Sequence, residues 1–375
     1  MKVEFVDIIL FVLMFQLLSI APFLLFSKNK RGLSNKILAI FILSKALCIS
    51  NFISFRLFNF TYEYFPHAFF FGSSFTILWG PGIYFYVKSL TQTDFRFRQK
   101  DLIHLIPFAV HFLYLFFTFH IYDAETKRIL ISQNLVFSNE LSQLVTGFTH
   151  LLILAYLIAS FLVLIKYRAN IKNSFSSIEK VNLSWMIFVL GGFSLKWSSD
   201  VWYFVNNLMQ IPSDVPLFLS RFFLFLFINI IIYKGLRQPE IFSGIIESQP
   251  ERRPFLSHSL QQEYISQLKE YMETKRPHLD PDLTLMDLAE KISIPYRALS
   301  EVINNGLKQN YYDFINGYRI RESQKLLSEN SSKFKTVLEV LYEVGYNSKS
   351  SFNAAFKKHT GMTPTEFKRL SAKQA

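Results

Sequence analysis

The chain has 375 residues, of which 50% are apolar, 17% aromatic and only 18% charged, and its formal net charge at pH 7 is +12. This composition is too apolar for an ordinary soluble protein and too charged for one that lies wholly in a membrane. The explanation is segregation, since 36 of the 42 phenylalanines lie in residues 1–250 and six in residues 251–375. These numbers exclude a uniform globular domain, a disordered chain and a disulfide-built secreted module, because Cys48 has no second cysteine to pair with.

The first two thirds of the chain contain seven apolar runs, each close to the 20 or so residues that a membrane helix needs. A buried helix of a soluble protein would explain one such run, but not seven in a row with short polar connections. We therefore predict a seven-helix transmembrane bundle over residues 1–235, acting as a sensor domain. The predicted spans are 5–26, 37–57, 68–89, 103–121, 148–166, 181–206 and 215–234.

Basic residues in the connections predict how this bundle is oriented. One alternate set of loops carries 14 lysines and arginines, whereas the opposite set carries four. Basic residues concentrate in cytoplasmic loops. The bias predicts an N-terminus outside the membrane and a cytoplasmic C-terminal third, and that result also requires an odd number of spans.

Four ionisable residues fall inside the predicted spans and mark a candidate intramembrane polar site. Lys196 and Asp200 are four residues apart, so they share one helical face. Asp200 and Arg221 fall at similar depths, which predicts an ion pair between the sixth and seventh spans. Charged groups in spans are functional candidates, although pairing that only locks the bundle together would also explain them. The four residues are Lys45, Lys196, Asp200 and Arg221.

Two other features of the spans carry weaker expectations. Gly80-Pro81-Gly82 in the third span predicts a kink or break, because proline lacks the amide donor and glycine loosens the backbone. His104 and His111 are seven residues apart on one face of the fourth span. Two histidines without a third ligand make a poor metal site, so we expect packed or hydrogen-bonded side chains and no metal.

Beyond the bundle, residues 236–261 contain four prolines or glycines among serines and glutamines, and are predicted to be a flexible cytoplasmic linker. Helical periodicity returns at 262–275. Two segments with one common plan follow, 284–304 and 336–358, each with a short helix, a tight turn and a second helix. Residues 311–328 between them are predicted to form a connecting helix.

Each of these segments has the pattern of a helix-turn-helix unit, which needs a small residue where the helices cross and a residue tolerant of positive φ at the turn. Ala289 and Ser293 take these positions in the first unit, and Leu341 and Gly345 in the second. Residues 262–371 resemble the tandem helix-turn-helix domain of the AraC/XylS family of bacterial transcription regulators. The stretches that carry the resemblance are VGYNSKSSFNAAFKKHTGMTPTEFKR at 344–369 and YRIRESQKLL at 318–327. Leu341 and Ser293 depart from the small residue and the glycine usual in the family.

The resemblance implies a domain that binds double-stranded DNA with its two recognition helices in successive major grooves. The early residues of such a helix face base edges, where arginine can bind guanine and asparagine adenine, while lysines farther along suit phosphates. Phe352 and Phe356 are predicted core residues rather than base-stacking groups. The predicted DNA-binding residues are Tyr296, Arg297, Ser300 and Asn304 in the first unit and Ser348, Lys349, Ser350, Asn353, Lys357 and Lys358 in the second.

The fold class predicted for the whole chain is all-α, a polytopic bundle followed by a cytoplasmic AraC-type domain. The predicted function is that of a sequence-specific transcription regulator anchored in the bacterial inner membrane, with a signal sensed outside or within the bilayer. Its expected partners are DNA, lipid, an unknown signal ligand and, because such units often act in pairs, a second copy in a homodimer. A transporter or a passive anchor with a regulatory DNA-binding tail is the alternative. We expect no enzyme activity and no cofactor, because the chain lacks HExxH, GxSxG and nucleotide-binding glycine motifs.

Overall fold

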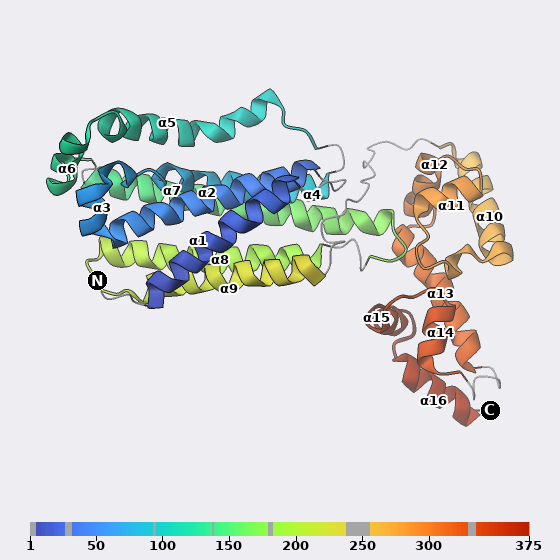
Figure 1. The fold of residues 1–375 in the computed structure, drawn as a ribbon. Helices are drawn as coiled ribbons and strands as arrows, with labels where there is room; N and C mark the ends of the chain where they lie inside the picture. The colour runs from blue at the N-terminus through green and yellow to red at the C-terminus, as the bar shows by residue number, and fades with distance from the viewer. Residues whose placement is uncertain are drawn as a thin grey trace. The chain divides into compact units, whose positions relative to one another are not determined.

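The structure is a computed structural model that describes residues 5–26, 32–92, 95–136, 139–178, 183–237, 256–328 and 335–374. Every regular element in these ranges is a helix (Figure 1), and the nearest approach to a strand among them is an isolated bridge between Phe175 and Thr284. The chain forms two compact units. One holds the described residues up to Ile165 and those from Leu183 to Arg237, and the other holds Lys166–Ile178 and the described residues from Leu256 onward.

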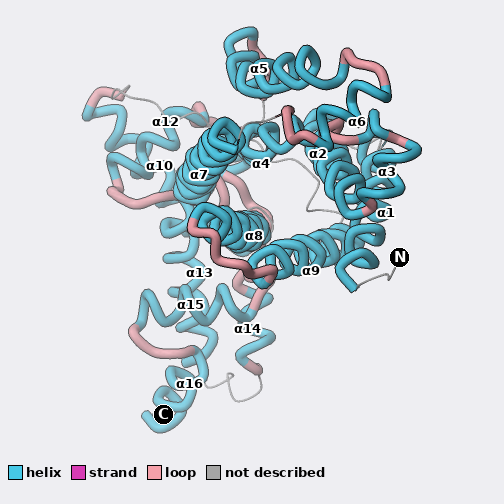
Figure 2. Tube along the Cα trace, turned by 90° about the vertical axis from the view of Figure 1, so that its left-hand side faces the viewer, coloured by secondary structure: helices cyan, strands magenta, loops and turns pink. Residues whose placement is uncertain are grey.

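The N-terminal unit is a bundle of long apolar helices joined by short ones. In it α1 packs on α2, α8 packs on α9, and α2 also contacts α4; Figure 2 shows the long helices nearly end-on. The α-helices are α1 (Phe5–Phe26), α2 (Gly32–Arg56), α3 (Phe58–Tyr64), α4 (Trp79–Thr91), α5 (Ile106–Leu115), α6 (Ala124–Ser132), α7 (Asn139–Asn170), α8 (Ser184–Leu208) and α9 (Val215–Arg237).

Four helical stretches among the described residues are long and apolar enough to cross a membrane: Ile8–Phe26, Leu33–Arg56, Gln99–His120 and Glu140–Asn173. Val215–Asn229 is a shorter apolar helix. Bulky apolar side chains point outward from these helices, and Phe15, Phe26 and Leu144 are 73%, 82% and 71% exposed. Such a surface is costly in water and suits lipid. Four of the seven predicted spans therefore lie in helices that are long and apolar enough to cross a membrane. Within the described residues, the helices at the other three predicted spans do not reach the same length and hydropathy.

The predicted third span, 68–89, is where the helix pattern departs most from expectation. It is divided among a turn at Pro66–Ala68, a 3₁₀ segment at Ser73–Leu78 and α4. The break comes just before Trp79, slightly ahead of the predicted Gly80-Pro81-Gly82. Pro81 lies in the first turn of α4, where a missing amide donor costs little. A Cβ on Gly80 would lie 2.6 Å from the Tyr156 ring, so this glycine also permits close packing.

The C-terminal unit contains two apolar cores, one for each predicted helix-turn-helix unit. Its connecting helix, α13, spans both cores, with Phe314 and Ile315 in the first and Ile320 and Leu327 in the second. The α-helices are α10 (His258–Lys275), α11 (Leu285–Lys291), α12 (Tyr296–Glu301), α13 (Tyr311–Ser328), α14 (Val337–Glu343), α15 (Lys349–Thr360) and α16 (Pro364–Gln374).

The linker predicted over 236–261 lies mostly outside the described residues. Its last part is helical, because α10 begins at His258, four residues before the predicted start, and is capped by Ser257, whose hydroxyl accepts a hydrogen bond from the Leu260 amide. Serine stabilises this position by satisfying an amide that the helix leaves unpaired. The domain boundaries 1–235, 236–261 and 262–371 stay predictions.

Candidate nucleic-acid interface and helical-bundle pocket

The two turns of the C-terminal unit have the same backbone hydrogen bonds. In the first, the Ile294 amide donates to the Ala289 carbonyl at 3.1 Å; in the second, the Tyr346 amide donates to the Leu341 carbonyl at 3.0 Å. The amides of Ser293 and Gly345 each donate to the carbonyl three residues earlier. Leu341 is 1% exposed at the crossing. The departure from a small residue is thus accommodated by packing without a change in the turn.

Ser293 and Gly345 both have positive φ, at 55° and 87°, as the sequence pattern predicts. The second turn needs its glycine more, because a Cβ on Gly345 would lie 2.6 Å from the Leu279 carbonyl oxygen. Ser293 is exposed, so its side chain has room in the same backbone conformation. Serine can therefore replace the usual glycine in the first turn, at a cost in backbone strain.

The first helix of each unit begins with a capping box, in which a threonine and an acidic residue bind each other's amides. In α11 the pair is Thr284 with Asp287, and in α14 it is Thr336 with Glu339. Both threonines occupy the same place in their units, 52 residues apart.

The predicted DNA-binding residues of the first unit lie along α12 and the π-helical turn Val302–Gly306 that continues it. Arg297 is exposed, whereas Ser300 and Asn304 are half-buried and hydrogen-bonded to each other at 3.2 Å. Tyr296, the first residue of α12, packs against the first core and brings its hydroxyl to 3.4 Å from the Ser174 hydroxyl. Its ring is therefore only partly available to DNA.

The predicted residues of the second unit lie on α15. Ser348 is its N-cap, accepting from the Ser351 amide, while Lys349 and Ser350 are exposed in its first turn. Asn353 is half-buried, and Lys357 and Lys358 are exposed. Lys358 also forms a 2.7 Å ion pair with Asp313 on α13, which ties the second recognition helix to the connecting helix. Phe352 and Phe356 are 0% exposed, which confirms them as core residues.

The residue that sequence reasoning missed is Arg319, in the middle of the connecting helix. It is 0% exposed, and its guanidinium donates to the carbonyls of His278 and Asp280, both at 2.7 Å. Further bonds reach Ser176. In the sequence, Arg319 stands in a run of polar residues on an apparently solvated helix, and nothing local distinguishes it from exposed Arg321.

The side chain of His278 is 4% exposed, and its pKa is shifted. Burial is the main cause that lowers the pKa of its imidazole to about 4, and the nearby Arg276 acts in the same direction. Glu322, which is paired with Arg276, opposes the shift. His278 is therefore neutral at physiological pH.

Comparison with known proteins places this C-terminal part in a family. Residues 288–370 match the model described as a helix-turn-helix domain. The melibiose operon regulatory protein of Escherichia coli K12 is 26% identical over 108 residues, 29% of this chain and 34% of that protein. The Msm operon regulatory protein of Streptococcus mutans is 24% identical over 130 residues, 35% of this chain and 45% of that protein. The C-terminal unit is an AraC-type helix-turn-helix domain.

Each of these two similarities covers less than half of either protein. The chain spans about a third of the length of the melibiose regulator that it matches. Among solved structures, the C-terminal domain of AraT, a response regulator from Geobacillus stearothermophilus, shares 25% identity over 31% of this chain and 88% of that chain, with a TM-score of 0.24.

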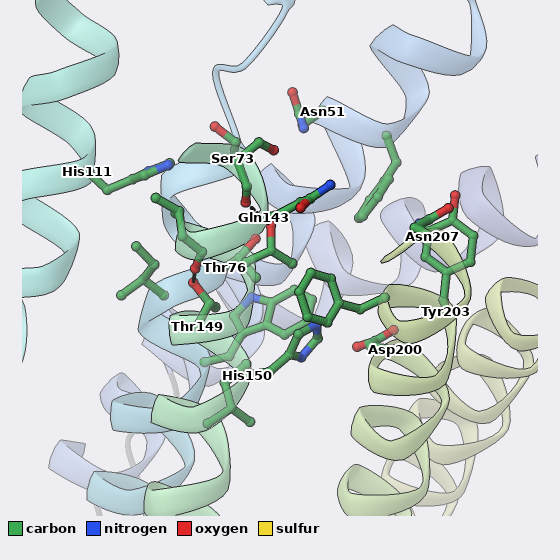
Figure 3. Close-up of a pocket in the computed structure, with 18 of the residues that line it drawn as sticks. Asn51, Ser73, Thr76, His111, Gln143, Thr149, His150, Asp200, Tyr203 and Asn207 are labelled. Atoms are coloured by element: carbon green, nitrogen blue, oxygen red, sulfur yellow. Dashed lines mark hydrogen bonds between the residues drawn. The ribbon is translucent and has the colours of Figure 1, made fainter. Parts of the chain in front are cut away.

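The helical bundle contains a pocket of about 500 Å³ with polar groups on its wall. Figure 3 shows Gln143, Thr149 and His150 facing it, opposite Asp200 and Tyr203. The first three come from α7 and the last two from α8, while Asn51, Thr76, Trp79 and His111 complete other parts of the wall. Asn51 Oδ1 and His150 Nδ1 are buried atoms with no hydrogen-bond partner among the described residues. The volume falls within the range of roughly 300–1,000 Å³ that is usual for small-molecule pockets.

Two of the four predicted intramembrane charges, Lys196 and Asp200, line this pocket. Lys196 and Asp200, predicted to share one helical face, form an ion pair with each other, and Asp200 also accepts a hydrogen bond from the Ser220 hydroxyl. Lys45 is 2% exposed, and its ammonium lies 2.8 Å from the centre of the Trp79 ring. Arg221 is half-buried on α9; its predicted pairing with Asp200 stays a prediction.

His104 and His111 are hydrogen-bonded side chains, as expected. His104 Nδ1 lies 2.5 Å from the Tyr156 hydroxyl, and His111 Nδ1 lies 2.8 Å from the Ser74 hydroxyl. Their partners come from different helices, so the two rings join elements of the bundle. His111 also lines the pocket.

Proposed function

We propose that the protein is a membrane-anchored, sequence-specific DNA-binding transcription regulator. The observation that carries the proposal is the pair of helix-turn-helix units with identical turn bonding, at the end of a chain whose other part has several helices of membrane length. The named relatives regulate operons, and their similarity to the AraC-type domain supports the same activity for this chain. No enzyme activity is included in the proposal.

Within this proposal, base edges are read by the exposed or half-buried residues at the beginning of α12 and α15. Arg297, Ser300 and Asn304 act in the first unit, together with the edge of Tyr296, and Ser348, Lys349, Ser350 and Asn353 in the second. Lys357 binds phosphate, and Lys358 does so when its pair with Asp313 opens. Base contacts supply specificity and phosphate contacts supply affinity.

For the bundle we propose seven spans, an N-terminus outside the bacterial inner membrane and a cytoplasmic AraC-type domain. The 14-to-4 distribution of basic residues supports this orientation. α8 is long enough to span at 25 residues, and its charges, Lys196 and Asp200, are paired with each other. Pairing lowers the cost of placing charges inside the bilayer.

We further propose that the pocket binds the signal. Its wall combines aromatic rings with amide, hydroxyl and imidazole groups, which suits a small molecule with an apolar body and a few hydrogen-bonding groups. Sensing is tested by replacing residues 1–165 and 183–235 with an unrelated anchor of equal span number. Inducible control of the target genes is expected to disappear, and retained control would reduce the bundle to a passive anchor.

DNA binding is tested with the purified full-length protein in nanodiscs. Selection from a random DNA pool should recover a consensus with two parts about one helical turn apart, one for each recognition helix. Affinity for the recovered duplex should exceed that for random DNA of equal length, and both should fall steeply with salt because phosphate contacts release counterions. Equal affinity for the recovered and random duplexes would contradict sequence-specific regulation.

A further inference from the structure

The loop between α7 and α8 is part of the C-terminal unit, although the chain places it between two helices of the bundle. We call residues 171–178 the α7–α8 loop. Ile171, Ser174 and Ser176 in it are 5%, 9% and 1% exposed. Short polar residues on a loop are rarely buried so deeply unless they pack against a partner.

The partner is the segment that leads into α11. Phe175 and Thr284 form an antiparallel bridge, and the Leu285 amide donates to the Ser174 carbonyl at 3.0 Å. The Ser176 hydroxyl donates to the Leu283 carbonyl at 2.5 Å. The loop thus pairs with three consecutive residues at the start of the first helix-turn-helix unit.

The loop also completes the surroundings of buried Arg319. Ser176 provides two acceptors, its carbonyl oxygen at 3.2 Å from Nη1 and its hydroxyl at 3.2 Å from Nη2. The side-chain amide of Asn316 reaches the same carbonyl at 3.5 Å. A buried donor without an acceptor is destabilising, so the Ser176 oxygens stabilise the buried guanidinium while the loop is docked.

The docked loop also contacts α12, the first recognition helix. The Ser174 hydroxyl lies 3.4 Å from the hydroxyl of Tyr296, the first residue of α12. A recognition helix presents its N-terminal residues to the major groove. The docked loop and a DNA duplex therefore both use the N-terminal end of α12.

The two helices that flank this loop also form the pocket. α7 contributes Gln143 and His150 and α8 contributes Asp200 and Asn207 to its wall. Along the chain, α7 ends at Asn170, directly before the loop, and α8 begins at Ser184, six residues after Ile178. A ligand that changes the spacing of α7 and α8 therefore acts on the two helices between which the loop lies in the chain.

We propose that the α7–α8 loop is an autoinhibitory element that couples the pocket to the first recognition helix. While Ser174 and Ser176 are docked, the first unit is held off DNA; movement of α7 against α8 withdraws the loop and releases Tyr296. The inference rests on the proposed function, since it assumes that α12 reads DNA. It adds the path by which the bundle controls that reading.

The docked state is tested with Phe175→Cys/Thr284→Cys in the full-length protein. Residues paired across antiparallel backbones have Cα atoms about 4.5–5.5 Å apart, within disulfide range. The matched control is Phe175→Cys/Thr336→Cys, because Thr336 has the same capping role in the second unit. Cleavage at a protease site inserted between residues 240 and 250 shows whether the two halves stay linked. Rapid linkage of the first pair alone is expected; equal or slower linkage than in the control overturns docking.

The consequence for DNA is measured on the same linked protein, using the duplex recovered by selection. The oxidised Phe175→Cys/Thr284→Cys protein should bind at least about tenfold more weakly than after reduction, in line with the loss of one good base contact. Unchanged or tighter binding in the oxidised form overturns autoinhibition. If the reduced protein and the control also fail to discriminate this duplex from random DNA, the proposed function itself is wrong.

A milder variant avoids the cap position altogether. Ser176→Ala removes the hydroxyl that binds Leu283 and Arg319 and should strengthen operator binding several-fold by loosening the loop. Ser328→Ala is its control, because the hydroxyl of that exposed serine donates to the Lys325 carbonyl in its own helix. Weaker binding by Ser176→Ala, with Ser328→Ala unchanged, would show that the loop supports DNA binding and would overturn the proposal.

Discussion

At the scale of single residues, the AraC-type domain depends on a few side chains at the beginning of its recognition helices. Arg297 and Lys349 are both exposed there, and in the proposed function their charges are the first to reach a major groove. Their neighbours Ala298 and Phe352 are 1% and 0% exposed and fix the helix against its core. The exposed residues can therefore change without loss of the fold.

Arg297→Ala and Lys349→Ala should each weaken binding to the selected duplex by about 1–3 kcal/mol if the side chains read bases. Fluorescence anisotropy at one fixed salt concentration measures this on the selected duplex and on random DNA. Lys325→Ala, an exposed lysine late in α13, is the control. Equal losses on both duplexes would assign the side chains to phosphates instead.

The lowered pKa of His278 predicts that the AraC-type domain is less stable at acidic pH. Its pKa in the folded domain is about 4, below the usual value of about 6.5, so the unfolded chain binds the proton more tightly. The unfolding free energy of the domain should therefore fall as the pH drops from about 6.5 to 4, by up to about 1.4 kcal/mol per pH unit. Hydrogen exchange of α13 in the full-length protein measures the fall. A slope as steep in His278→Gln would show that His278 is not its source.

At the scale of elements, the two turns show how one backbone plan accepts different residues. Ser293→Gly removes the strain of a side chain at positive φ but adds chain entropy to the unfolded state, so stability should stay within about 1 kcal/mol. Gly345→Ser meets the Leu279 carbonyl as well as the strain, and should destabilise the second unit by at least about 2 kcal/mol. Hydrogen exchange of α11 and α14 compares the two. A similar loss of stability in both variants would contradict the close approach of the Leu279 carbonyl to Gly345.

The sequence predicted those elements whose signals are local. α13 begins and ends where its pattern indicates, at Tyr311 and Ser328, and both turns follow from residue type. The third apolar run was predicted less well, because hydropathy does not register a 3₁₀ segment before Trp79. Burial of Arg319 and docking of Ser176 could not be predicted, since both depend on residues about 140 positions apart that carry no motif.

At the scale of the whole molecule, the two parts of the chain that differ in composition also form two separate structural units. The phenylalanine-rich part forms the bundle with outward apolar side chains, and the charged part forms the AraC-type domain with its two cores. The α7–α8 loop is the exception, because it leaves the bundle in sequence and joins the other unit. In the proposed function, this arrangement needs no diffusible messenger between the signal and the DNA.

The most direct measurement of the central claim is crosslinking of the tagged full-length protein to DNA in intact bacteria, followed by sequencing of DNA recovered from the membrane fraction. A tethered regulator predicts discrete sites in that fraction, lost in an Arg297→Ala/Lys349→Ala double variant that still reaches the membrane. Sites recovered only from the soluble fraction, or no enrichment in either fraction, would contradict a regulator that acts from the membrane.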